Sequence, residues 1–324
     1  MWQPQWPPRE LIDFIRSGAK FIIAGHKEPD ADCIGSQLAL ASLLHRLGKE
    51  SVLCSAGPFN RTEIQQYQSL IKSQISEADR KGAFVLIVDC SMEERTGDIA
   101  PSLRGLPTAL IDHHASGAPF GDALYLDAES PSTTALVFML FKALGETPTP
   151  EEASLLFFGL AADTGFFRHV DAGGGAVYAT ASELIQHGAN PKSAFAQMHG
   201  GKTLNSRLLL ASVLSHAVPY FDGRLIVSTE ELEETRRFGM ESRDSDTLYQ
   251  LIQSIEGVEA IVIIRQESEG RCSVGLRSRD AVDVASIAAH LGGGGHKNAA
   301  GFAKDGIIKE IYPLILEEFA KVFR

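Results

Sequence analysis

Long apolar stretches are absent from the sequence. No run approaches the roughly 18 consecutive apolar residues of a membrane-spanning helix, so we expect no membrane partner. Residues 1–10 hold two tryptophans and three prolines but lack the apolar segment of a secretory signal peptide. We therefore expect a cytoplasmic protein.

Cysteine is scarce as well. The four cysteines form no C-x-x-C pair, and they lie in or beside apolar runs, at Cys33, Cys54, Cys90 and Cys272. Reduced cysteine behaves as a small hydrophobe in such places. The pattern indicates no disulfide framework and favours a reducing compartment.

Positive charge is in the minority. The chain of 324 residues has 30 Lys and Arg against 41 Asp and Glu, a formal net charge of −11. This balance argues against binding by counterion release along a polyanion, so we expect no long duplex nucleic acid as a partner. The negative charge does not exclude binding of a short phosphorylated ligand. The length favours two domains, and the hydrophobic residues, 44% of the chain, are enough to build a core without disulfides.

The first half of the chain alternates between apolar runs and amphipathic stretches. Four runs predict strands, at residues 20–24, 51–54, 84–88 and 109–111. Apolar positions near helical spacing predict helices at 34–47, 131–144 and 150–163. Strands that are apolar throughout and alternate with helices are typical of parallel sheets covered on both faces. We therefore predict an α/β fold with a doubly wound, mainly parallel sheet.

The second half has a different pattern. Helices are predicted at 179–187, 244–255, 283–290 and 308–322, and short strands at 225–227, 260–264 and 271–277. Residues 266–270 predict a hairpin-like connection between the last two strands. The organisation we expect is a first domain over 1–190, a helical linker over 191–216 and a smaller α+β domain over 217–324. We expect a cleft between the two domains.

Polar side chains gather where the apolar runs of the first half end. They are His26, Asp30 and Asp32 after the first strand, Asp89 after the third, Asp112, His113 and His114 after the fourth, and Asp163 near the end of a helix. Ligands of open α/β sheets bind beyond the carboxyl ends of the strands, so these groups should meet at one edge. Carboxylates crowded there repel one another unless cations neutralise them. Oxygen donors with some imidazole suit Mn²⁺ or Mg²⁺ better than a closed zinc site.

Each of these residues also has a plain structural interpretation. Asp89 or Asp112 alone would be a turn residue or a helix cap, and Asp32 could cap the helix that follows it. Two adjacent histidines can be incidental. The recurrence of the same kinds of group after three predicted strands favours the metal site.

A glycine-rich segment marks the second domain. Residues 292–295 are four consecutive glycines, followed by His296 and Lys297. Glycine N–H groups can approach a phosphate closely, and Arg277 at the end of a predicted strand can add a guanidinium fork. The alternatives are a flexible loop and a surface charge. We favour a binding loop because the glycines run almost directly into the apolar stretch 299–302.

Five motifs in order along the chain resemble the DHH phosphoesterases that carry the DHH-associated C-terminal domain. They are residues 25–36 (GHKEPDADCIGS), Val88-Asp89, Asp112-His113-His114, residues 162–165 (ADTG) and residues 292–296 (GGGGH). A D-H-H sequence alone is weak evidence, whereas all five in this order are specific and span nearly the whole chain. The sequence is most similar to the nanoRNase and pAp phosphatase (NrnA-type) branch of this family.

The resemblance implies a hydrolase with two Mn²⁺ ions, for which Mg²⁺ or another divalent cation could substitute. It implies six metal ligands, namely His26, Asp30, Asp32, Asp89, His113 and Asp163, with Asp32 and Asp89 as candidates to bridge the ions. His114 would contact the scissile phosphate, and Asp112 would orient the imidazoles. The implied substrate contacts, around the cleft between the domains, are Arg168, Arg277, Ser278, Gly293, Gly294, Gly295 and His296.

Two positions depart from the pattern of the family. Cys33 stands where a small alanine is commoner, which we expect to be harmless. Residues 115–117 (ASG) stand where many relatives have an asparagine, which bears on a side-chain contact and not on the metal site.

The implied activity is hydrolysis of pAp to AMP and phosphate, and of short oligonucleotides to mononucleotides, by a metal-activated water. The expected partners are short oligonucleotides and nucleotide bisphosphates, and a homodimer stays open. A phosphodiesterase for cyclic or linear dinucleotides and a non-catalytic nucleotide sensor are the alternatives. A RecJ-like exonuclease would need a longer chain and a basic channel, and a family II inorganic pyrophosphatase has a different C-terminal domain.

Overall fold

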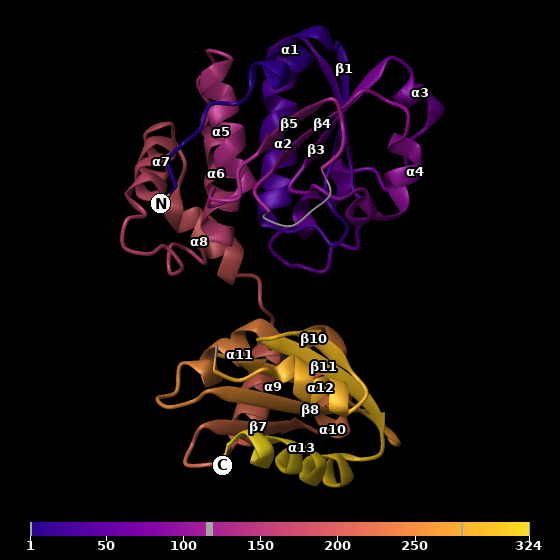
Figure 1. Ribbon diagram of the computed structural model, residues 1–324, viewed down its shortest axis with the longest axis vertical. Helices are drawn as coiled ribbons and strands as arrows, with labels where there is room; N and C mark the ends of the chain where they lie inside the picture. The colour runs from indigo at the N-terminus through magenta and orange to yellow at the C-terminus, as the bar shows by residue number, and fades with distance from the viewer. Residues whose placement is uncertain (1, 115–118, 280, 324) are drawn as a thin grey trace. The chain divides into compact units, whose positions relative to one another are not determined.

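The computed structural model describes residues 2–114, 119–279 and 281–323 and divides the chain into two compact units (Figure 1). The first unit is Met1–Gly201 and the second is Lys202–Arg324. Residues 115–117, where the sequence departs from the family pattern, lie outside the described residues. No helix of the described chain combines the length and the apolar character needed to cross a membrane.

The division between the units falls within the segment for which a helical linker is predicted. Two helices form there, α8 (Pro191–His199) in the first unit and α9 (Leu204–Ser215) in the second. Asn190 caps α8 and Thr203 caps α9, each through a side-chain oxygen that accepts a backbone N–H of the first turn.

A five-stranded parallel sheet forms the centre of the first unit and confirms the predicted doubly wound α/β fold. The strands stand in the order β2-β1-β3-β4-β5. Their bounds are β1 Lys20–Ala24, β2 Glu50–Cys54, β3 Ala83–Val88, β4 Thr108–Asp112 and β5 Ala123–Leu126. The sequence did not reveal β5, because its residues alternate between buried and exposed positions and form no continuous apolar run.

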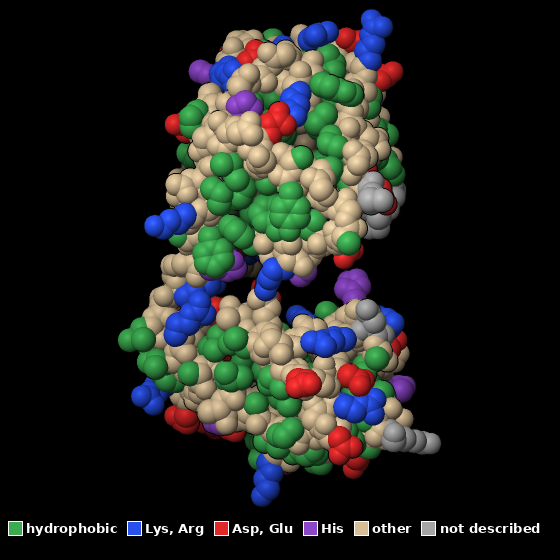
Figure 2. Space-filling model, turned by 90° about the vertical axis from the view of Figure 1, so that its left-hand side faces the viewer, with side chains coloured by type: hydrophobic (Ala, Val, Ile, Leu, Met, Phe, Trp, Pro, Cys, Tyr) green, Lys and Arg blue, Asp and Glu red, His purple; other side chains and the backbone are tan. Residues whose placement is uncertain are grey.

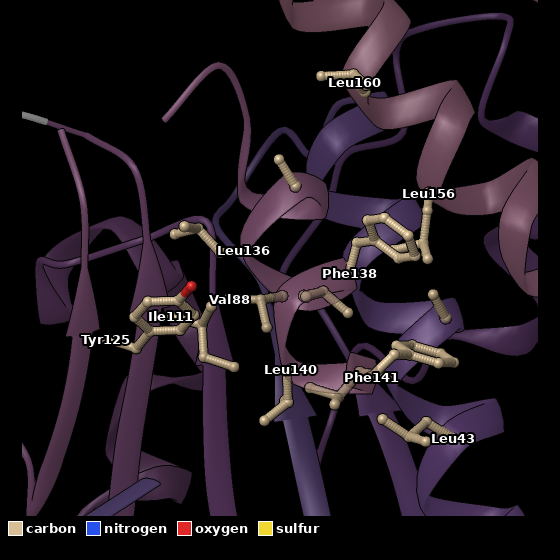
Figure 3. Packing of buried hydrophobic residues seen from close by; sticks show 14 of the residues in the cluster. Leu43, Val88, Ile111, Tyr125, Leu136, Phe138, Leu140, Phe141, Leu156 and Leu160 are labelled. Carbon is tan, nitrogen blue, oxygen red and sulfur yellow. The ribbon is translucent and has the colours of Figure 1, made fainter. Parts of the chain in front are cut away.

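Helices cover both faces of this sheet. Phe21 and Ile23 of β1 belong to one buried cluster, while Ile22 and Ala24 point to the opposite face and belong to another. The larger cluster packs under α1 (Arg9–Ser17), α2 (Ala31–Arg46), α5 (Thr133–Ala143) and α6 (Pro150–Asp163). Figure 3 shows Phe138 of α5 beside Leu156 of α6 in this core. The shorter elements on the other side are α3 (Glu77–Arg80), the 3-10 turn Glu93–Ile99 and α4 (Ala100–Leu103). The 3-10 turn Gln65–Leu70 instead packs through Tyr67 against a smaller cluster that holds Ile34 of α2 and Phe158 of α6.

Capping residues set where the long helices begin. The hydroxyl of Thr149 accepts the N–H of Glu152, whose carboxylate accepts the N–H of Thr149, and Pro150 occupies the first turn of α6. Ser132 caps α5, so this helix starts at Thr133 rather than at Pro131 as predicted. The last long helix of the unit, α7, spans Gly175–Gln186 and begins earlier than the predicted 179–187.

The second unit contains a mixed sheet of six strands in the order β10-β11-β9-β8-β7-β6, which confirms the predicted α+β character. The pair β7–β8 is parallel and the other pairs are antiparallel, including the expected hairpin β8–β9. The strands are β6 Val218–Tyr220, β7 Leu225–Glu230, β8 Ala260–Ser268, β9 Arg271–Ser278, β10 Gly294–His296 and β11 Ala299–Asp305. The remaining helices are α10 Leu232–Phe238, the 3-10 turn Met240–Ser242, α11 Ser245–Gln253, α12 Val284–His290 and α13 Ile308–Val322.

The glycine-rich segment is partly an edge strand rather than wholly a loop. Gly294–His296 pairs with β11 as β10. A Cβ on Gly293 would lie 2.2 Å from the carbonyl oxygen of Gly301, and one on Gly295 would lie 2.5 Å from that of Ala299. Glycine is therefore required at these two positions for the close approach of β11. Around Gly294, by contrast, a Cβ would meet open space.

Candidate metal centre

The candidate centre lies at the carboxyl ends of β1, β3 and β4. In this strand order the chain passes from β1 to β2 on one side and from β3 to β4 on the other side. Doubly wound sheets bind ligands at the point between two neighbouring strands where the direction of the connections reverses in this way. His26 follows β1, Asp89 follows β3 directly, and His113 follows β4 directly. The structure thus brings together side chains that are 63 and 87 residues from His26 along the chain.

The two oxygens of Asp89 face two different histidines. Its Oδ2 lies 3.4 Å from Nε2 of His26, and its Oδ1 lies 3.6 Å from Nε2 of His113. His113 Nε2 also lies 3.1 Å from Oδ2 of Asp163, at the end of α6. Asp89 has a φ of +60°, a backbone conformation that non-glycine residues rarely adopt and that is concentrated at functional sites.

Both histidines are oriented by backbone carbonyls. Nδ1 of His26 lies 2.7 Å from the carbonyl oxygen of Lys27, and Nδ1 of His113 lies 3.1 Å from that of Ser130. Because a carbonyl accepts hydrogen bonds, each Nδ1 donates, and each Nε2 is left to face the carboxylates. Histidines that bind metals are held in this way, with the far ring nitrogen donating to a fixed acceptor.

Asp32 is fully buried and fixed by the start of α5. It accepts hydrogen bonds from the backbone N–H of Thr133 at 2.6 Å and from the N–H and hydroxyl of Thr134 at 2.9 and 2.6 Å. The alternative that Asp32 caps its own helix is wrong, because Asp30 is the N-cap of α2 and accepts the N–H groups of Asp32 and Cys33. This cap also explains why α2 begins three residues before the predicted start.

Three residues that support the acids were not found from the sequence. Thr133 donates its hydroxyl to Oδ1 of Asp89 at 3.0 Å, and Thr134 binds Asp32. A Cβ on Gly159 of α6 would lie 2.7 Å from Oδ1 of Asp32, so glycine leaves the space for this carboxylate. No motif marks these positions, since their role depends on the packing of α5 and α6 against α2.

Burial and mutual repulsion disfavour negative charge on two of the acids. Burial raises the pKa of Asp32 well above its usual range, and the charges of Asp163 and Asp89 raise it further. Burial, together with Asp89, also raises the pKa of Asp163. Burial acts in the same direction on Asp89, but His26 and His113 hold the pKa of Asp89 below its usual value.

The same carboxylates favour positive charge on the histidines. Burial lowers the pKa of His26, but the groups of Cys33 and Asp89 beside it outweigh this effect and raise the pKa to about 12. Burial likewise lowers the pKa of His113, and its hydrogen bond to Asp163 and the charge of Asp32 raise it to about 10. A cluster that stabilises protonated imidazole stabilises bound cations by the same attraction.

His114 stands beside this cluster and is oriented by Asp112. One oxygen of the buried Asp112, Oδ1, lies 2.7 Å from Nδ1 of His114 and accepts the backbone N–H of His114. The other, Oδ2, is buried and has no hydrogen-bond partner among the described residues. His114 Nδ1 is 3.6 Å from Oδ1 of Asp89. The side chain of His114 is 32% exposed, against 6% for His26, so it is the more accessible imidazole.

Three groups of donor atoms could hold a metal ion among the described residues. They are His26–Cys33–Asp89, Asp89–His113–His114 and Asp32–His113–Asp163, and within each group all donor atoms lie within 4.8 Å of one another. Five of the six predicted metal ligands belong to these groups. The sixth, Asp30, is 3.9 Å from Nε2 of His26 and serves as the helix cap. Cys33 belongs to a donor group although it is not among the predicted ligands.

A cavity of about 440 Å³ opens beside Asp163. Trp2, Pro131, His169 and Val177 are among the residues that line it.

The predicted substrate residue Arg168 lies just beyond Asp163. It is exposed, and its Nε donates to the carbonyl of Gly165. Phe166 and Phe167 between them have positive φ angles of 55° and 68°. Phe167 stacks on the exposed Tyr178 of α7 with ring centres 5.5 Å apart. Hydrophobic side chains gather at the surface of this side of the first unit (Figure 2).

The other predicted substrate residues belong to the second unit. The guanidinium of Arg277 lies over the ring of Tyr249, 4.7 Å from its centre. His296 is exposed on the edge strand β10. Ser278 is buried, and its hydroxyl donates to the carbonyl oxygen of Val282. The predicted substrate contact of Ser278 thus stays a prediction, beside a structural role that the sequence did not suggest.

Two family models match the chain: "DHH family, N-terminal domain" over residues 20–160 and "DHHA1 domain" over residues 222–324. The chain is 32% identical to the bifunctional oligoribonuclease and PAP phosphatase NrnA of Thermus thermophilus, over 96% of this chain and 93% of that protein. It is 27% identical to the protein of the same name from Bacillus subtilis, over 90% and 91%. An exopolyphosphatase-related protein from Bacteroides fragilis has the same fold, with a TM-score of 0.79, 22% identity and coverage of 97% and 96%. The chain therefore belongs to the DHH family of hydrolytic phosphoesterases.

Proposed function

We propose that this protein is a metal-dependent phosphoesterase that hydrolyses pAp to AMP and phosphate and degrades short oligonucleotides to mononucleotides. The relatives from Thermus thermophilus and Bacillus subtilis are both named as bifunctional oligoribonucleases and PAP phosphatases, which supports both activities. The proposal extends their substrates to this chain because the similarity covers both units.

The observation that carries the proposal is the position of Asp89. Its two oxygens face His26 on one side and His113 on the other, and it is a member of two donor groups. A carboxylate shared in this way suits a bridge between two cations. Asp32 is the weaker candidate for a bridge, because three donors of Thr133 and Thr134 already occupy its oxygens.

The donor set fits divalent cations. Three carboxylates and two histidines with inward-facing Nε2 atoms converge, and the ion pairs that the described residues offer to Asp32, Asp89 and Asp163 all come from histidines. We propose Mn²⁺, or Mg²⁺ in its place, held by His26, Asp30, Asp32, Asp89, His113 and Asp163. Divalent cations in such a centre lower the pKa of a bound water and polarise phosphoryl oxygens.

His114 would contact the phosphate of the substrate rather than serve as a buried ligand of the metal ions. Asp112 fixes Nδ1 of His114, so Nε2 is the free ring atom, and the side chain is accessible. When protonated, Nε2 can donate a hydrogen bond to a phosphoryl oxygen and stabilise the charge that develops there.

Each unit offers residues that we propose as substrate contacts. On the first, Arg168 offers N–H groups to a phosphate, and the cavity beside Asp163 offers the apolar side chains of Trp2, Pro131 and Val177 to a nucleoside. On the second, we propose Arg277, His296 and the open backbone at Gly294 as contacts for the far phosphate, with Gly293 and Gly295 shaping the strand. Ser278 would position the segment that precedes α12 by binding Val282.

A parallel substrate assay tests the proposal. The Mn²⁺-loaded protein is offered pAp, pApA, cyclic di-AMP, inorganic pyrophosphate and a long single-stranded oligonucleotide, and product release is measured. We expect kcat/KM for pAp and pApA to exceed the others by at least about tenfold. Preference for cyclic di-AMP would identify the dinucleotide phosphodiesterase instead. Binding of pAp without any product release would identify a sensor.

Variants of the centre test the assignment of its residues. Asp89→Asn and His113→Ala should each lower kcat/KM for pAp by about 10³-fold or more, since each removes a direct metal ligand. Asp13→Asn and His45→Ala are matched controls, because both residues are exposed on helices of the same unit, and they should leave the rate unchanged. Activity within tenfold of the wild type in Asp89→Asn would refute the assignment.

A further inference from the structure

Cys33 places a sulfur atom inside the candidate metal centre. It lies in the first turn of α2, is fully buried, and donates its N–H to Oδ1 of Asp30. Its sulfur and the donor atoms of His26 and Asp89 lie within 4.8 Å of one another. The sequence suggested that a cysteine here is a harmless replacement for alanine, whereas the structure places its sulfur among metal donors.

The surroundings hold this sulfur in place. Oε1 of Gln37 is 3.9 Å from Sγ, and the Gln37 amide is itself anchored by donating to the carbonyls of Ile23 and Cys54 at 2.8 and 2.9 Å. A Cβ on Gly25 would lie 2.2 Å from Sγ, so glycine directly after β1 leaves the space that the sulfur occupies. Donors that are oriented in advance by neighbours are the ones that bind metals well.

The donor groups at the two sides of Asp89 therefore differ in chemistry. The group Asp32–His113–Asp163 offers oxygen and nitrogen, whereas His26–Cys33–Asp89 offers nitrogen, sulfur and oxygen. Sulfur is a soft donor and favours Zn²⁺, Co²⁺ and Cd²⁺ over Mn²⁺ and Mg²⁺. The two sides of Asp89 would therefore prefer different metal ions.

We propose, on the basis of the metal-dependent function put forward above, that Cys33 is a ligand of the cation bound by His26 and Asp89 and that this position prefers a thiophilic divalent ion. The sulfur would bind as a thiolate and release its proton to solvent as the cation enters. The opposite position, at Asp32, His113 and Asp163, keeps the preference for Mn²⁺ or Mg²⁺.

A spectroscopic experiment tests this ligand without relying on turnover. Metal-free full-length protein is titrated with Co²⁺, bound cobalt is counted by equilibrium dialysis, and the near-ultraviolet sulfur-to-cobalt charge-transfer band is recorded. We expect the band in the wild type and in Cys54→Ala, a buried cysteine outside the three donor groups, and its loss in Cys33→Ala and Cys33→Ser. Far-ultraviolet circular dichroism confirms that each variant is folded.

Metal competition gives a second measure. In Cys33→Ser the Kd for Cd²⁺ should rise at least about tenfold, as expected for loss of a direct ligand, while the Kd for Mn²⁺ should change less than about threefold. Bound cobalt without the band, or a band that persists in Cys33→Ala, overturns the sulfur ligand and leaves the proposed function intact. Failure of the wild type to bind Co²⁺ or Mn²⁺ at all overturns both.

Discussion

Each unit of the molecule buries an ionic cluster, but the carboxylates of the two clusters are neutralised differently. In the second unit Glu230 is 1% exposed, and its Oε1 and Oε2 accept from Nε of Arg243 at 2.6 Å and from Nε of Arg265 at 2.9 Å. In the first unit, within the part of the chain that the structure describes, the buried Asp32 and Asp89 form ion pairs with histidines alone.

The difference separates a structural cluster from a functional one. Guanidinium groups carry a permanent charge, so the cluster around Glu230 is balanced by the chain itself. Imidazoles lose their charge when they bind a metal, so the carboxylates around Asp89 depend on a cation from outside the chain. Burial with incomplete internal compensation is the sign of a binding centre.

The largest effect expected from this comparison is on folding stability. Glu230→Gln should lower the free energy of unfolding of the second unit by about 3 kcal/mol, because it removes the carboxylate that pairs with Arg265 and leaves Arg243 paired with Glu267 alone. Asp163→Asn, measured with a chelator, should leave the stability of the first unit unchanged or raise it by about 1 kcal/mol, because it relieves repulsion from Asp89.

Urea unfolding of the full chain can resolve the two units. Both tryptophans, Trp2 and Trp6, lie in the first unit, so fluorescence reports that unit, while circular dichroism reports both. Trp2 is buried, and its indole N–H donates to Asp127, so its emission should respond to unfolding. A loss of about 3 kcal/mol in Asp163→Asn would show that its carboxylate stabilises the fold and would remove the contrast.

A slightly smaller effect is expected on adding metal. Mn²⁺ at about 100 times its Kd should raise the free energy of unfolding of the first unit by about 2.7 kcal/mol, by binding to the native state alone. The second unit should not respond, because the charges around Glu230 are already balanced. Asp89→Asn should reduce the response of the fluorescence transition. Equal stabilisation of both units would contradict a single centre at Asp89.

The sequence predicted well what depends on continuous patterns. The four apolar runs became β1 to β4, because residues buried on both faces of a parallel sheet must be apolar throughout. The polar residues that end these runs converge for the same reason: parallel strands bring their carboxyl ends to one edge. His26, Asp89 and His113 could therefore be placed together before the structure was known.

What the sequence could not predict depends on contacts between distant segments. Thr133 and Gly159 serve the centre because α5 and α6 pack against α2, and no local pattern records this. Cys33 was expected to be harmless because one position in a helix does not reveal which donors its side chain approaches. The glycines at 292–295 suggested a loop, but Gly294–His296 pairs with β11, a contact that spacing alone does not reveal.

The smallest effect concerns an acid of the first unit that has its own cation. Asp79 accepts from Nζ of Lys72 at 2.9 and 3.0 Å and from the hydroxyl of Ser76 at 2.7 Å, and these bonds, Lys72 first, hold the pKa of Asp79 below its usual range. A carboxyl whose pKa is lowered on folding stabilises the native state fully above its unfolded pKa, about 3.9, and this contribution is lost as the pH falls through the folded pKa. Asp79→Asn should therefore lower the free energy of unfolding by about 1–2 kcal/mol at pH 7, and the difference from the wild type should shrink below about pH 4.

Glu77→Gln changes an exposed acid in the same helical turn, so it is the matched control and should alter the free energy of unfolding little. A difference that persists unchanged at low pH would mean that Asp79 acts through packing and not through its charge, and Asp79 would then no longer serve as the internally neutralised counterpart of Asp89.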